Sequence, residues 1–339
     1  MKKQNKLRHY LGKQEIAGYV FILPFIIGFL AFMAIPMFLS FVFSFTDYDI
    51  LSKPAFIGIN NFKNMFFNDP KFWKVFKVTL KYVIFSVPLK LLMALLVALL
   101  LVRNTKLSGF YRAVYYLPSI IGSSVAVAIL WRRMFASDGV INSILQSIGI
   151  PSNIPWLGRE STAIWTLIIL TVWQFGSSML IFLSGIKQIP VTLYESAKVD
   201  GAIGIQRFFK ITLPMLTPTI FFNLINQLIN GFMAFTQSYI ITQGKPRDST
   251  LFYTVYMYQN SFTYNKMGYG SAMAGLVIGI QYLTTLLSRP LTSSLCDRLG
   301  SKLSVICGLL ACALSGLLTL VAPLQNHAAT GLALLLVGR

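Results

Sequence analysis

Residues 195–214 read ESAKVDGAIGIQRFFKITLP, a charged stretch that lies between two long apolar runs. The runs on either side, residues 161–186 and 215–244, contain no Asp, Glu, Lys or Arg. A helix that crosses a bilayer needs about 20 apolar residues. The stretch is therefore predicted to be a polar loop that joins two membrane-spanning helices.

The rest of the chain repeats this alternation of apolar and polar segments. Its 339 residues are 55% hydrophobic and only 12% charged, whereas soluble domains average about 25% charged residues. We expect an all-α, polytopic membrane protein with six spans before residue 289 and at least one extra apolar helix after it. The apolar runs cover residues 16–46, 82–102, 113–131, 161–186, 215–244, 267–288 and 303–338, of which 82–102 is interrupted once, by Lys90.

The formal charge of +19 would suggest a nucleic-acid partner in a soluble protein. Here the basic residues flank apolar runs, so lipid headgroups and membrane orientation explain them better. Five Lys or Arg in residues 2–13 predict a cytoplasmic N-terminus. With alternating sides, the inside segments hold 15 basic residues and the outside segments hold 12, which is a weak bias.

The loop has local signals for a bent helical element. Pro190 suits a helix first turn, and Thr192 with Glu195 three residues later fits a capping box. Gly201 fits the left-handed position that ends a short helix. Pro214 is predicted to open the following span. An ordinary amphipathic loop lying on the bilayer is the alternative interpretation.

The spacing of these residues resembles the EAA loop of ATP-binding cassette (ABC) importer permeases of the carbohydrate type. Ser196 stands where the second alanine of that motif is usual. Residues 58–62, 69–73, 112–118 and 235–244 also resemble this family. The resemblance covers residues 1 to about 274 and implies a six-helix transmembrane domain with its coupling loop at 190–214. The residues that it places at the ATPase contact are Glu195, Ala197, Asp200, Gly201, Ile211, Leu213 and Pro214.

The resemblance also implies how such a subunit works. The chain lacks the phosphate-binding pattern Gly-x4-Gly-Lys-Ser/Thr, so ATP hydrolysis is expected in a separate ABC ATPase subunit and the chain is not expected to be an enzyme. A second permease subunit and an extracytoplasmic solute-binding protein are the other implied partners. We expect a multi-pass protein of the bacterial cytoplasmic membrane that imports a sugar or related small solute, with no cofactor and no metal.

Several polar side chains in the spans are candidates for the solute pathway. Asn223, Asn226, Gln227 and Asn230 have spacings of three and four, which put them on one helical face. Such a stripe either joins helices or lines a wet path. Trp173 and Gln174 form a second candidate pair. Lys90 suggests a snorkelling or paired cation, with direct solute contact as the alternative.

The last part of the chain differs in composition. All 27 phenylalanines lie at or before Phe262, and all three cysteines lie after residue 295 at spacings that suit no metal site. Residues 275–339 resemble a truncated segment of a major facilitator superfamily transporter. The loop residues that carry this resemblance are Asp297, Arg298, Gly300 and Lys302, with Ser293 and Ser301 departing from the pattern.

These observations predict a chimeric chain with a junction near residue 274. Two alternatives to a working sugar permease follow from it. One is a non-functional or engineered hybrid that inserts without transport, because a borrowed span was selected to pack elsewhere. The other is a proton-coupled facilitator-type transporter, which the missing repeats disfavour.

Overall fold

The computed structural model describes residues 14–102, 106–150 and 153–279. They form two units, one of residues up to Asp69 together with Met257–Gly279, and one of Pro70–Tyr256. Almost all of the regular structure is helical, as the apolar runs predict. The facilitator-like segment, with Asp297, Arg298, Gly300 and Lys302, lies outside the described residues.

The first unit opens with one long apolar helix. Helix α2 (Gln14–Phe29) continues through a π-helical turn, η1 (Leu30–Ala34), into α3 (Ile35–Phe43). Residues Tyr19–Phe43 are long and apolar enough to cross a membrane. Their large apolar side chains are exposed on every side of the helix, which is the surface expected of a span in contact with lipid.

The segment after α3 is held to the end of the same unit. Strand β1 (Thr46–Asp47) pairs antiparallel with β2 (Ala55–Phe56), followed by α4 (Asn60–Lys63) and the turn η2 (Asn64–Asn68). The Asn61 amide donates to the carbonyl oxygens of Ser44 and Thr46, each at 2.9 Å. After the turn η5 (Gln259–Thr263), a helix spans residues Met267–Gly279. Its Gly268 N–H donates to the Tyr48 carbonyl oxygen at 3.0 Å.

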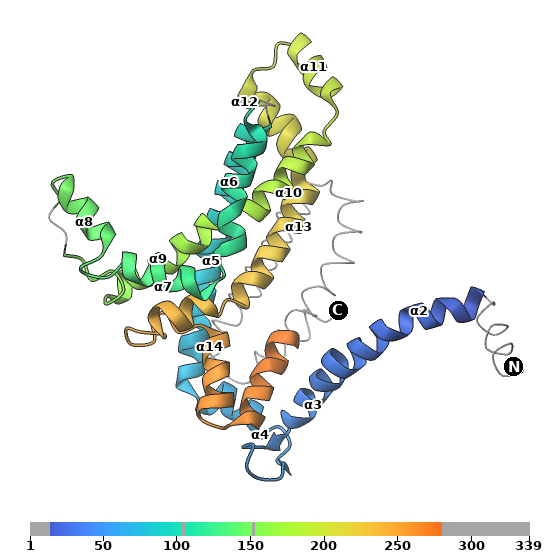
Figure 1. Ribbon diagram of the computed structural model, residues 1–339, viewed down its shortest axis with the longest axis vertical. Helices are drawn as coiled ribbons and strands as arrows, with labels where there is room; N and C mark the ends of the chain where they lie inside the picture. The colour runs from blue at the N-terminus through green and yellow to red at the C-terminus, as the bar shows by residue number, and fades with distance from the viewer. Residues whose placement is uncertain (1–13, 103–105, 151–152, 280–339) are drawn as a thin grey trace, which may run out of the picture. The chain divides into compact units, whose positions relative to one another are not determined.

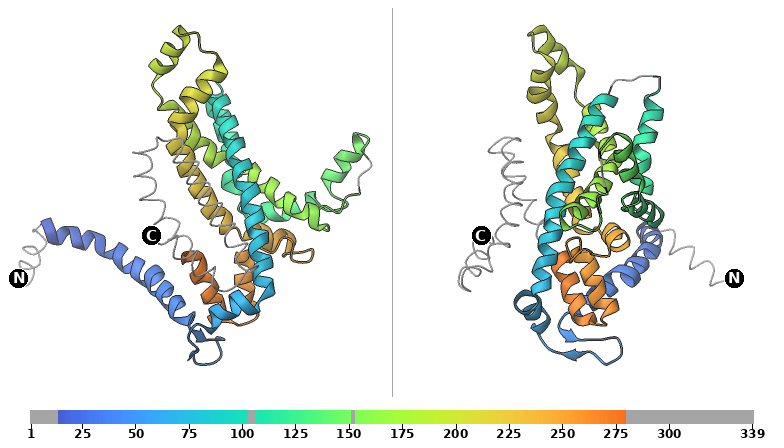
Figure 2. Two further views of the ribbon diagram at one scale, coloured as in Figure 1. Left: turned by 180° about the vertical axis from the view of Figure 1, so that it is seen from behind. Right: turned by 90° about the vertical axis from the view of Figure 1, so that its left-hand side faces the viewer.

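The second unit is a bundle around α5 (Pro70–Leu101), with α6, α10 and α13 side by side and α11 at one end (Figure 1). Views from behind and from the side keep α11 and α12 at that end (Figure 2). The remaining elements, in chain order, are α6 (Ser108–Ile121), α7 (Val125–Met134), α8 (Val140–Ser147), α9 (Glu160–Trp173), α10 (Gly176–Lys187), α11 (Val191–Val199), α12 (Gly204–Arg207), η3 (Phe208–Thr212), α13 (Leu213–Phe232), η4 (Gln237–Thr242) and α14 (Tyr253–Tyr258).

Helix α5 supplies the core of this unit and packs against α9, α10 and α13. Its Tyr82 is fully buried, and the Tyr82 hydroxyl lies 2.6 Å from the hydroxyl of Thr171 on α9. The Tyr82 ring also contacts the ring of Phe252, with centroids 4.4 Å apart. Thr79, one turn earlier, accepts a 2.8 Å hydrogen bond from the backbone N–H of Tyr253. These contacts fix the segment before α14 against α5.

Two of the expected spans are broken helices. Helices α6 and α7 meet at an angle of 95°, and α9 and α10 meet at 43°. A break leaves backbone groups without helical partners, which is costly where no water is present. The Gln174 side chain at the second break donates to the carbonyl oxygen of Gly122 at the first, at 2.9 Å. Ser124 caps the start of α7 by accepting from the Val127 N–H at 3.3 Å.

The breaks explain where the structure departs from the expected row of straight spans. Within the described ranges, three helices are long and apolar enough to cross a membrane, and the total reaches five if each bent pair is one span. The expected span over 267–288 appears as the 13-residue helix Met267–Gly279, and the rest of that run is outside the described residues. Apolar length predicts insertion, but it does not show where a helix will bend.

Glycine at the α9–α10 break should be indispensable. A β-carbon on Gly176 would overlap the backbone of Tyr115 and Tyr116 on α6. Gly176→Ala should therefore force α6 and α10 apart and lower the free energy of unfolding by about 1–3 kcal/mol, the usual cost of overpacking.

The measurement is the midpoint of thermal unfolding in detergent. The control is Gly109→Ala, because a β-carbon at this α6 position meets nothing within 4 Å. Equal midpoints for the two variants would contradict the close packing of the two breaks.

Candidate functional site

The loop between α10 and α13 ends its first helix with a complete Schellman motif. Gly201 has φ +75°, a left-handed conformation that glycine adopts without strain. The Ala202 N–H donates to the Ala197 carbonyl oxygen at 2.8 Å, and the Gly201 N–H donates to that of Lys198 at 3.1 Å. These are the two bonds that define this helix ending. The prediction of a left-handed Gly201 is confirmed.

The chain then returns to the bundle through a second helical segment. The Ile203 N–H donates to the Gln206 side chain at 3.1 Å at the start of α12. Helix α12, the turn η3 and α13 follow one another without a loop. The Tyr194 hydroxyl lies 2.9 Å from the Thr212 hydroxyl and joins α11 to η3. The loop is therefore a bent helical element, as its sequence predicts. Its first helix is joined to its last turn by the Tyr194–Thr212 contact.

The start of α11 differs from the sequence prediction. The helix begins at Val191 with Pro190 as the N-cap, and no side chain caps it. The predicted capping box is wrong, because Pro190 already has the extended ψ of 130° that starts a helix. Thr192 then lies inside the first turn, beyond the position from which it could act as the N-cap.

Exposed apolar side chains gather on this loop. Val199 is 88% exposed, Ile205 is 67% exposed and Ile203 is 61% exposed. The loop also carries exposed Val191, Leu193 and Phe209. Apolar side chains displayed together on a polar segment mark a surface that another protein or a membrane covers. The sequence motif did not single these residues out, although aliphatic residues in a charged stretch are a signal that could have done so.

The predicted coupling residues occupy different positions on this element. Glu195, Asp200 and Gly201 are exposed, whereas Ala197 is half-buried and its carbonyl oxygen takes part in the helix ending. Ile211, Leu213 and Pro214 are half-buried in the continuous helix that follows. The structure thus places Glu195, Ala197, Asp200 and Gly201 at the elbow, which is the bend around Gly201 at the end of α11. Ile211, Leu213 and Pro214 lie on the helical segment that enters the bundle.

The polar stripe of α13 divides between two faces. Asn223 and Gln227 are buried, together with Gly231 one turn further on. The Asn223 amide donates to the Ser178 carbonyl oxygen on α10 at 3.2 Å. Asn226 is half-buried and donates to the Phe222 carbonyl oxygen of its own helix at 2.8 Å, and Asn230 is exposed. Spacing alone placed all four on one face, but residues three apart differ by about 60° around a helix.

The second candidate pair also has structural contacts. Gln174 is buried and its amide donates to Gly122, so this side chain joins the two helix breaks. Trp173 is 37% exposed, and its ring lies 6.0 Å from that of Trp131. The Trp131 indole donates to the Thr166 carbonyl oxygen at 3.0 Å. The sequence did not identify Trp131 or Gly122 as parts of this cluster.

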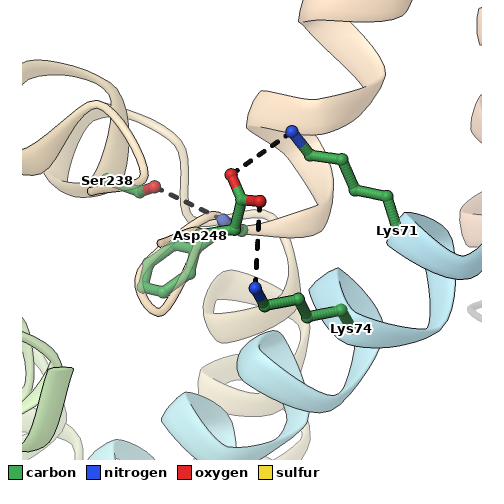
Figure 3. A network of polar contacts seen from close by, with 5 residues as sticks. Lys71, Lys74, Ser238 and Asp248 are labelled. Atoms are coloured by element: carbon green, nitrogen blue, oxygen red, sulfur yellow. Dashed lines mark hydrogen bonds and ion pairs between the residues drawn. The ribbon is translucent and has the colours of Figure 1, made fainter. Parts of the chain in front are cut away.

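A cluster of charges joins Asp248, on the loop between η4 and α14, to helix α5 (Figure 3). Asp248 lies 3.2 Å from the Lys71 ammonium and 4.0 Å from that of Lys74, both on α5. Asp248 has φ +60°. The loop is held from inside by Ser238, which donates to the Thr250 carbonyl oxygen at 2.5 Å. Across the described ranges, no group of three or more His, Cys, Asp or Glu side chains could hold a metal ion.

The chain matches known proteins over most of its length. Residues 71–293 match the family model described as "Binding-protein-dependent transport system inner membrane component". This match extends beyond the junction predicted near residue 274. The probable ABC transporter permease protein YesP of Bacillus subtilis is 54% identical over 289 residues, which are 85% of this chain and 92% of the relative. The arabinooligosaccharides transport system permease protein AraP of the same organism is 31% identical over 300 residues, 86% and 93% of the two chains.

The fold also has a counterpart among solved structures. A chain of the bacterial alginate ABC transporter, solved in complex with an alginate pentasaccharide-bound periplasmic protein, superposes with a TM-score of 0.71. It is 26% identical, and the match covers 83% of this chain and 96% of that one.

The Asp248 ion pairs should contribute little to stability. Asp248 and Lys71 keep 36% and 38% of their side chains exposed, so solvent screens their attraction. Asp248→Asn should lower the free energy of unfolding by less than about 1 kcal/mol. Asn tolerates the left-handed conformation, so this change removes only the charge.

Asp248→Ala is the comparison, because it adds the strain of a left-handed alanine and should cost about 1 kcal/mol more. Both are measured by thermal unfolding at low and high salt. A large loss in Asp248→Asn alone would show that the ion pairs hold this loop.

Proposed function

The chain belongs to the family of binding-protein-dependent transport system inner membrane components, as a non-catalytic permease subunit of an ABC importer, and we propose that its solute is a carbohydrate. Several relatives support this proposal by their names, which describe permeases for arabinooligosaccharides, starch degradation products or lactose. The solved neighbour carries alginate, also a saccharide. A sugar requires many hydrogen-bond partners along its path, and the spans of this chain carry buried amides.

The loop at 190–214 is the proposed docking element for a separate ABC ATPase. The observation that carries this proposal is the display of Val199, Ile203 and Ile205 on a segment whose bend is fixed by backbone hydrogen bonds. A rigid element transmits motion because it moves as a body. The apolar side chains supply area to bury in a partner, at about 25 cal/mol per Å². Glu195 and Asp200 add a negative edge at the elbow.

The other proposed partners complete the importer. A second permease subunit would complete the pathway, as the resemblance to ABC importer permeases implies. An extracytoplasmic solute-binding protein would deliver the sugar, which is supported by the periplasmic protein in the neighbouring solved complex. The basic segment at residues 2–13 supports a cytoplasmic N-terminus and hence a cytoplasmic position for the loop at 190–214.

The solute pathway is proposed to follow the amides of α13. Asn223 and Gln227 face the interior of the bundle, and Asn226 and Asn230 lie toward its outer side. Trp173 remains a candidate for stacking against a sugar ring, because more than a third of it is exposed. The amide of Gln174 is already bonded to Gly122, so its proposed contribution is to shape the path.

The facilitator-like addition at residues 275–339, with Asp297, Arg298, Gly300 and Lys302, stays a proposal, and its first part, residues 275–293, overlaps the match to the permease family. The support is compositional, since this part contains no phenylalanine. Uptake into membrane vesicles separates the possible consequences. Uptake that requires ATP supports a working permease, uptake that requires a proton gradient supports a facilitator, and no uptake indicates a hybrid that only inserts.

Gly201 tests the shape of the docking element. Gly201→Ala has open space for its β-carbon, but it places alanine at φ +75°, at a cost of about 1–2 kcal/mol. The elbow should therefore relax and the ATPase should co-purify less with this variant. Gly204→Ala is the matched control, because it is in the same loop, has open space and lacks the positive φ. Equal ATPase recovery with both variants would exclude a role for the elbow.

Val199 tests the surface of the same element. Val199→Asp should lower ATPase co-purification at least about tenfold, since burying a charge in an apolar contact is unfavourable. Thermal unfolding of the isolated permease should not change, because the side chain is 88% exposed. The control is Val140→Asp at the start of α8, where valine is also exposed. Retention of the ATPase by Val199→Asp would mean that the loop docks elsewhere or not at all.

A further inference from the structure

Lys90 is a buried cation in the spanning bundle. It lies in the run 82–102 of α5, about 12 Å from the outer end of that run at 1.5 Å per residue. Only 9% of the residue is exposed. A lysine at the centre of a spanning helix costs about 2.5–3.5 kcal/mol on insertion scales. A lysine buried at this depth is therefore expected to have a structural or functional role.

The structure provides no counter-charge for Lys90. The apolar runs 82–102, 113–131, 161–186 and 215–244 contain no Asp or Glu. Of the side chains that the structure describes, none forms an ion pair or hydrogen bond with Lys90, whereas four other basic side chains pair with carboxylates. No negative partner for this ammonium lies among the described residues, so an anion that enters the bundle is one group that could neutralise it.

Helix register places Lys90 at about the same height in the bundle as the buried amides of α13. A β-carbon on Gly231 would meet the side chains of Val83 and Val87 at 3.1 and 3.4 Å, so these residues lie opposite one another. Helices α5 and α13 run in opposite directions (Figure 1). Lys90 is about 7.5 Å further along α5 than the midpoint of the two valines, and Gln227 and Asn223 are about 6 and 12 Å back along α13. Lys90 therefore has the height of these two amides.

Lys90 shares the α5 face of Val83 and Val87 that meets Gly231 of α13, whereas Asn223, two turns from Gly231, is turned toward Ser178 of α10. Val83, Val87 and Lys90 are separated by four and three residues, and Gly231, Gln227 and Asn223 are each separated by four. Within the described part of the chain, Asn223 still has a free hydrogen-bond acceptor. The side-chain oxygen of Asn223 is buried and accepts no hydrogen bond from the described residues. The carbonyl oxygen of Ser178 accepts the Asn223 amide hydrogen bond. The hydroxyl of Ser178 is also buried and has no hydrogen-bond partner among the described residues.

We propose that Lys90, Asn223 and Gln227 form a binding site for the carboxylate and adjoining hydroxyls of an acidic saccharide. This inference rests on the proposed carbohydrate transport and names its substrate class. The ammonium matches a uronate carboxylate, because a charge-assisted hydrogen bond in a water-poor site is strong. The amides match the sugar hydroxyls, since each can both donate and accept. A neutral sugar would leave the ammonium without a negative partner.

The test uses the complete importer in proteoliposomes with its ATPase, second permease and binding protein. Labelled oligosaccharides, some containing uronate and some neutral, are separated by anion exchange into acidic and neutral pools and offered together with ATP. We expect wild-type vesicles to accumulate the acidic pool. Lys90→Met should lower this uptake at least about tenfold, and Lys90→Arg should retain most of it because the charge is kept.

The controls separate a binding role from a structural one. Lys90→Met removes a buried charge, so thermal unfolding should be unchanged or occur at a higher temperature. Lys81→Met changes an exposed lysine of the same helix and should leave uptake unchanged. Co-purification of the second permease should also be unchanged in Lys90→Met.

Three results would overturn the site. The first is preferential uptake of the neutral pool by the wild type, and the second is unchanged acidic uptake by Lys90→Met. The third is loss of the second permease from Lys90→Met, which would make Lys90 an assembly contact. If wild-type vesicles accumulate neither pool, the proposed transport function itself fails, and the site falls with it.

Discussion

The second unit depends on satisfying backbone hydrogen bonds where water is scarce. Two of its helix pairs break inside apolar runs, and a break exposes carbonyl and N–H groups that hydrocarbon cannot bond. The Gln174 amide, which donates to the Gly122 carbonyl oxygen, brings the two breaks together. Gly176 permits this approach, because any side chain there would collide with the backbone of α6. The two breaks are thus joined, and the side chain at the second break satisfies a carbonyl oxygen at the first.

The sequence predicts the elements whose signals are local. Apolar runs indicate the spans, and Gly201 indicates the end of α11 because only a few residue types tolerate its left-handed conformation. The bends at Gly122 and Gln174 could not be predicted in this way. Gln174 stabilises its break through a residue 52 positions away, and such a contact has no periodicity to detect. The start of α11 differs from its prediction because Pro190 and Thr192 offer competing local signals.

The candidate sites also combine features that local sequence predicts with features that depend on packing. Four amides at spacings of three and four suggested a single stripe, but the position of α13 against α5 and α10 buries Asn223 and Gln227 and leaves Asn230 exposed. Spacing fixes the angles between side chains and leaves open which direction is the interior. On the loop at 190–214, the motif selected the residues that shape the elbow. The residues that supply apolar area, such as Val199, became evident only from their exposure.

Helix α5 must meet two opposing demands. Around Tyr82 it is a tightly packed core, held by a ring contact with Phe252 and a hydroxyl pair with Thr171. Two turns later it carries Lys90, which no neighbouring carboxylate neutralises within the described residues. A core selected for stability alone would have a leucine or methionine at this position, because an apolar side chain of similar volume avoids the desolvation cost. Helix α5 instead holds a buried charge at the height of two buried amides of α13, and this departure from an apolar core is what the proposed solute site would explain.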